Sequence, residues 1–70
     1  MPADAFREYL AALPEDLLEQ VSEDYVWLAR RGFRGKPAVE FERRRECSRA
    51  ECVRRGCPGL YRQAEWSVAA

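Results

Sequence analysis

Three prolines and two glycines divide this 70-residue chain into four segments, each of a length typical of a helix. Pro14, Pro37 and Pro58 each open a segment, and proline fits the first turn of a helix because its backbone angle is preset and its missing N–H is not needed there. Gly32 and Gly56 each follow a pair of arginines. Cations favour the last turn of a helix and glycine favours the left-handed conformation after it, so these positions predict helix ends.

Apolar residues within the segments recur at the three- and four-residue spacing of one helix face. The chain also lacks Ile, Thr and Asn, which removes two of the three β-branched residues and favours helix over sheet. We expect helices over residues 3–12, 14–31 and 37–55 and a fourth that begins at Pro58. The residues predicted to face the core are Phe6, Tyr9, Leu10, Leu13, Leu17, Leu18, Val21, Tyr25, Leu28, Leu60, Tyr61, Ala64 and Val68. The predicted fold is all-α, a small bundle of three to four short helices in a single helical domain over residues 1–70.

The predicted third helix does not have a single apolar face. Phe41 and Cys52 lie on one side of it, whereas Val39, Ala50 and Val53 lie on another. A surface helix carries one apolar stripe, so this helix either crosses the bundle and is packed on both flanks or leaves one flank for another protein.

Several large apolar residues point away from the predicted core faces. Val26 and Trp27 lie outside the arc of the second helix, and Trp66 lies outside that of the fourth. In a chain of this length such side chains either cover a neighbouring helix end or anchor an interface. The predicted interface residues are Val26, Trp27, Phe41 and Trp66. The corresponding function is a small non-catalytic protein–protein interaction module, either self-associating as a homo-oligomer or bound as an accessory subunit of a larger assembly.

The charges are sorted along the chain. Residues 1–29 carry seven acids and one base, a net charge of −6, and residues 30–70 carry eleven bases and five acids, a net charge of +6. The arginine-rich segment 30–55 therefore supports a second hypothesis, a small nucleic-acid-associated regulator. Its predicted contacts are Arg30, Arg34, Lys36, Arg43, Arg45 and Arg49. Most arginines of the third helix follow an acid by three or four residues, however, and that order favours ion pairs within the helix over phosphate contacts.

No constellation of residues in the sequence points to catalysis, a cofactor or a metal. The chain has no His, and its serines have no nearby base, so we expect a non-enzyme. Cys47, Cys52 and Cys57 recur every five residues, a spacing that cannot bring three thiolates to one ion on a continuous helix. They are either packing residues or a redox-active pair around Gly56. No apolar run is long enough to span a membrane and no leader is evident, so a cytoplasmic location is expected.

Overall fold

Each of the four predicted segments forms a helix in the computed structural model, which describes residues 3–32, 34–35 and 38–69. In chain order they are α1 (Ala3–Ala11), α2 (Glu15–Arg31), α3 (Ala38–Arg54) and α4 (Pro58–Ala69). The prediction of a small all-α bundle is confirmed. The predicted helix bounds are right to within about two residues, although the expected start at Pro37 lies outside the described residues.

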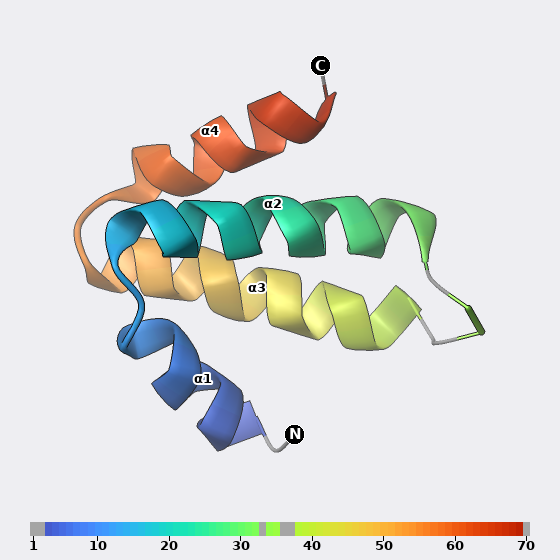
Figure 1. Cartoon of the computed structure of the whole chain (residues 1–70), viewed down its shortest axis with the longest axis horizontal. Coiled ribbons are helices and arrows are strands. Elements are labelled where there is room, and N and C mark those ends of the chain that lie inside the picture. Colours follow the sequence, from blue (N-terminus) through green and yellow to red (C-terminus); the bar gives the residue numbers. More distant parts are fainter. Residues whose placement is uncertain (1–2, 33, 36–37, 70) are drawn as a thin grey trace.

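The helices form a flat molecule with extents of 34 × 31 × 15 Å. α2 and α3 run antiparallel side by side, α4 packs against both, and α1 packs obliquely against α3 (Figure 1). A thickness of 15 Å corresponds to about two packed helix layers. A molecule this thin has much surface for its volume, so it cannot enclose all of its apolar side chains.

The two predicted helix stops are confirmed by hydrogen bonds at the glycines. The N–H of Gly32 donates to the carbonyl oxygen of Leu28 at 2.7 Å and ends α2. At the end of α3, the N–H of Gly56 donates to Val53 and the N–H of Cys57 donates to Cys52, both at 2.9 Å. Gly56 has a φ of 75°, and this pair of bonds around a left-handed glycine is the Schellman motif.

The core lies where α1, α2, α3 and α4 meet, and α2 turns a different face to it than the apolar pattern predicted. Leu17, predicted to be buried, is 49% exposed, whereas Val26, predicted to be at an interface, is 2% exposed. The buried residues of α2 are Leu18, Ser22 and Val26. Because the centre of the buried face is a serine, the apolar pattern alone pointed to a face rotated away from it. The exposure predicted for Val26 is therefore wrong.

The surface position predicted for Phe41 is also wrong. Its side chain is 7% exposed, and its ring lies 6.5 Å from that of Tyr25 on α2. Cys52, on the same side of α3, is fully buried. Val39 and Val53 on the other side of α3 are exposed. The third helix was expected either to be packed on both flanks or to leave one flank uncovered. The structure has the second geometry, with one flank of α3 packed within the chain and the other exposed.

Arg55, which directly follows the last residue of α3, joins α1 to the bundle. Nη2 of Arg55 donates to the carbonyl oxygen of Leu10, in the last turn of α1, at 2.8 Å and to that of Leu13, just after α1, at 2.7 Å. Its Nε donates to Oε2 of Glu51 at 2.7 Å. The last carbonyls of a helix lack their usual partners within that helix. This guanidinium supplies a donor to the carbonyl oxygen of Leu13 and a second donor to that of Leu10, which also accepts the N–H of Leu13 at 3.1 Å.

Glu51 makes the stability of the fold sensitive to acid. This carboxylate is 7% exposed, and hydrogen bonds from Arg54 and then Arg55 lower its pKa from 4.5 to about 2, against the opposing effect of burial. Because the folded pKa is depressed, the stabilisation is present above about pH 4.5 and is lost as the pH falls towards 2. We expect the free energy of unfolding to fall over this range. Urea titrations followed by circular dichroism measure this free energy at each pH, and it should fall less for Glu51→Gln than for the unchanged chain. An equal dependence on pH in the two proteins would contradict the role of Glu51.

Candidate protein-binding surface

Two open grooves meet at Trp27, which is 43% exposed on α2. The first groove, of about 410 Å³, lies where α1 and α2 meet, and the second, of about 440 Å³, lies between α2 and α4. Asp24 and Trp27 line both. We call the combined lining the Trp27 surface; it consists of Tyr9, Val21, Glu23, Asp24, Tyr25, Trp27, Leu28, Arg31, Ser67 and Val68.

The Trp27 surface is aromatic and apolar at its centre. Tyr9 on α1 is exposed, while Tyr25 and Leu28 on α2 are half-buried. The guanidinium of Arg31 lies 5.0 Å from the centre of the Trp27 ring, a cation–π contact one turn further along α2. The indole therefore has a neighbour that orients it and still leaves much of its surface to solvent. Aromatic rings of this kind, between open grooves, are typical anchors of protein interfaces.

The acidic residues beside Trp27 have no ion-pair partner among the described side chains. The ion pairs between described residues all lie within residues 40–55, where Glu40, Glu42, Glu46 and Glu51 pair with arginines of α3 and with Arg55 just after it. None joins the acidic first half of the described chain to the basic second half. Asp24 accepts one hydrogen bond, from Nε2 of Gln20 at 3.2 Å, and keeps its charge uncompensated by a base. The Trp27 surface therefore combines exposed apolar area with acidic groups.

Two of the predicted nucleic-acid contacts, Arg45 and Arg49, are held by hydrogen bonds to glutamates of their own helix. Arg45 is half-buried, and its Nε donates to Glu42 at 2.8 Å while its Nη1 donates to Oη of Tyr61 at 2.6 Å. The bond to Glu42 raises the pKa of Arg45, and Glu46 does the same for the pKa of Arg49. Of the other predicted contacts, Arg30, Arg34 and Arg43 are exposed and Lys36 lies outside the described residues. The predicted ion pairs within the third helix are confirmed at Glu42–Arg45, Glu46–Arg49 and Glu51–Arg54.

The structure separates the four predicted interface residues into two pairs. Trp27 and Trp66 are at the surface, at 43% and 73% exposure, whereas Val26 and Phe41 are in the core. Trp66 lines neither of the two grooves that meet at Trp27, so the two indoles do not share this site. The sequence reasoning missed Tyr9 and Asp24. Tyr9 was assigned to the core face of its helix, and a single aspartate gives no pattern signal.

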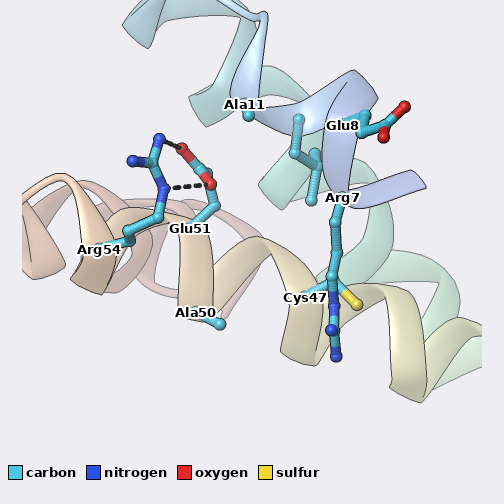
Figure 2. A pocket seen from close by; sticks show the side chains of 8 residues that line it. Arg7, Glu8, Ala11, Cys47, Ala50, Glu51 and Arg54 are labelled. Atoms are coloured by element: carbon cyan, nitrogen blue, oxygen red, sulfur yellow. Dashed lines mark hydrogen bonds and ion pairs between the residues drawn. The ribbon is translucent and has the colours of Figure 1, made fainter. Parts of the chain in front are cut away.

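A further groove, of about 310 Å³, lies between α1 and α3 (Figure 2). The side chain of Arg7 passes beside the thiol of Cys47 there, and the ion pair between Glu51 and Arg54 closes one end (Figure 2). No buried polar side chain without a partner points into this groove among the described residues, since the one such atom found is Oγ of Ser22 on α2. This groove is the seam along which α1 packs on α3.

The sequence matches no protein-family model, and no curated protein or solved structure matches the chain. Across residues 3–32, 34–35 and 38–69, no cluster of three or more Cys, Asp or Glu side chains is placed to hold a metal ion. In the same ranges, no helix has the length and apolar character needed to cross a bilayer.

Proposed function

We propose that this chain is a small, non-catalytic protein–protein interaction module that uses the Trp27 surface to bind a basic, partly apolar segment of another polypeptide. The observation that carries the proposal is the position of Trp27, 43% exposed at the meeting point of two grooves. Exposed tryptophans in such positions supply a large share of interface energy. The unpaired carboxylates of Glu23 and Asp24 beside it give the partner its expected charge, because complementary charge guides association.

The same charges favour a different polypeptide over a second copy of this chain. If two copies met through their Trp27 surfaces, the Glu23 and Asp24 carboxylates of both copies would be gathered in one interface with only Arg31 of each copy as a base, and an excess of like charge disfavours association. The basic helix α3 of a second copy is a poor alternative occupant, since four of its acids already pair with its arginines. We therefore propose that the chain is an accessory subunit of a larger assembly, and self-association is the alternative that the experiments below must exclude.

Nucleic-acid binding has less support than protein binding. A duplex-binding face needs several free cations directed to one side, so that they replace counterions together. Arg45 and Arg49 are held by Glu42 and Glu46, and Arg45 also donates to Tyr61. These bonds would have to break before either guanidinium reached a phosphate.

Binding of a basic amphipathic helix tests the proposal. The probe is a synthetic, fluorescently labelled peptide of about 18 residues with arginine on one face and leucine on the other. We expect Trp27→Ala to weaken its binding by about 30-fold, because losing an interface tryptophan typically costs 2 kcal/mol or more. Trp66→Ala is the matched control, since it removes an exposed indole that lines none of the described grooves, and it should change the affinity less than about twofold. Fluorescence anisotropy measures both.

The electrostatic part of the proposal has its own control. A peptide with glutamate in place of every arginine should not bind, and added salt should weaken the arginine peptide. Equal losses from Trp27→Ala and Trp66→Ala would indicate that the peptide adheres to any exposed indole. That result, or an affinity unaffected by salt, would contradict the proposed surface. Sedimentation velocity on the chain alone should report a monomer, and a stable dimer would favour self-association instead.

A further inference from the structure

Cys52 and Cys57 are held close together by the end of α3. The chain turns back at Gly56, and the N–H of Cys57 donates to the carbonyl oxygen of Cys52 at 2.9 Å. With standard bond lengths on either side of this hydrogen bond, the two Cα atoms are no farther apart than about 6.8 Å. Disulfides span Cα separations of about 4.4 to 6.8 Å, so the main chain here is within bridging range.

Cys47 and Cys52 provide an internal comparison, because they are five residues apart in the sequence, as Cys52 and Cys57 are. Both lie within the continuous helix α3, where residues five apart have Cα atoms about 8.6 Å apart and side chains rotated by about 140°. That distance exceeds the disulfide range. The spacing of five residues therefore allows a bridge only across Gly56, where the helix ends.

The two thiols of this pair differ in accessibility. Cys57 is half-buried between α3 and α4, whereas Cys52 is fully buried and faces α2, where the hydroxyl of Ser22 is likewise fully buried. Burial raises the pKa of the Cys52 thiol, and the nearby Cys57 adds to that rise. In a Schellman motif the side chains on either side of the turn commonly contact each other. An oxidant from solution would therefore meet Cys57 first and have Cys52 close behind it.

We propose that Cys52 and Cys57 form a dithiol site that is oxidised to a disulfide by low-molecular-weight disulfides such as oxidised glutathione. The Cys57 thiolate attacks one sulfur of the small disulfide, forms a mixed disulfide and releases one thiol. The Cys52 thiolate then attacks Sγ of Cys57, breaks the bond to the second small thiol and closes the protein disulfide. Two protein thiols are oxidised, one small disulfide is reduced to two thiols, and the two protons pass to the released thiolates. This site is independent of the Trp27 surface.

The chain offers a direct assay, because trypsin cuts after Arg54 and Arg55, between the two cysteines. The native protein is incubated with oxidised glutathione, alkylated with iodoacetamide, digested and analysed by mass spectrometry. We expect residues 50–54 and 56–62 to appear as one disulfide-linked pair, at about tenfold the yield of any pair that contains Cys47. Cys47→Ser should leave the linked pair unchanged, and Cys57→Ser should leave Cys52 reduced.

Three results would overturn the inference. The first is Cys57 that stays glutathionylated without closing onto Cys52. The second is linkage through Cys47 at equal or higher yield. The third is that the preference for the Cys52–Cys57 pair over pairs with Cys47 is the same in about 8 M urea, where α3 no longer fixes the turn. If the preference for the Cys52–Cys57 disulfide is present in the native protein and lost in urea, the geometry at Gly56 is supported as its cause.

Discussion

Phe41→Ala is expected to lower the free energy of unfolding by about 3 to 5 kcal/mol, because it removes an aromatic side chain from the interior and leaves a cavity. Phe41 is 7% exposed, and its ring packs near Tyr25, which in turn meets Phe6 edge-on at 5.4 Å. The loss should therefore loosen α1 and the start of α3 together. Urea unfolding followed by circular dichroism measures the change. In a domain of this size the expected loss is a large fraction of the total free energy of unfolding.

Val53→Ala is the matched control for Phe41→Ala. Val53 lies on the uncovered flank of α3 and is exposed, so its truncation should change the free energy of unfolding by no more than about 0.5 kcal/mol. If Phe41→Ala were as mild as Val53→Ala and instead dissociated an oligomer, Phe41 would be an interface residue after all. That outcome would contradict the packing of α3.

Arg55→Ala is expected to lower the free energy of unfolding by about 3 kcal/mol. It leaves the carbonyl oxygen of Leu13 without a donor, removes the guanidinium bond to the carbonyl oxygen of Leu10, and removes one of the two arginines that neutralise the buried carboxylate of Glu51. Each lost hydrogen bond to a charged group costs about 1.5 to 3 kcal/mol, and the effects are not additive. Hydrogen exchange should show faster exchange in α1 than in α2, because Arg55 connects α1 to α3.

Arg54→Ala provides the comparison for Arg55→Ala. Both guanidiniums bind Oε2 of Glu51, but the side chain of Arg54 is 63% exposed and reaches no other element among the described residues. An exposed ion pair contributes about 0.2 to 1 kcal/mol, so Arg54→Ala should be mild. Equal effects of the two substitutions would show that the ion pair with Glu51 matters and that the bonds from Arg55 to α1 do not.

The positions of the helices could be predicted from the sequence because their boundaries depend on local chemistry. Gly32 and Gly56 end helices through hydrogen bonds within a few residues of the chain, so no knowledge of the tertiary fold was needed. The ion pairs of α3 were predictable for the same reason, since Glu42–Arg45 and Glu46–Arg49 join residues one turn apart. Local signals of this kind also carried the prediction of an all-α fold.

The faces of the helices were less predictable because they depend on which neighbours each helix meets. Ser22 and Ser48 are fully buried where the helices pack, and polar residues at such positions hide the true core face from an apolar pattern. Arginine stems on the packed flank of α3 have the same effect: Nη1 of Arg44 donates to Tyr25 at 2.9 Å, and its guanidinium lies 5.3 Å from the ring of Phe6. Val26 and Phe41 were consequently assigned to the surface, although Trp27 and Trp66 were placed there correctly.

Chemical-shift mapping tests the central claim, that the Trp27 surface is the docking site, most directly. The ¹⁵N-labelled chain is titrated with the leucine–arginine peptide, and amide shifts are followed residue by residue. We expect the largest shifts at Tyr9, at residues 23–31 of α2 and at Ser67 and Val68, with the indole N–H of Trp27 moving and that of Trp66 unchanged. Shifts centred on the uncovered flank of α3, around Val39 and Val53, would contradict the account.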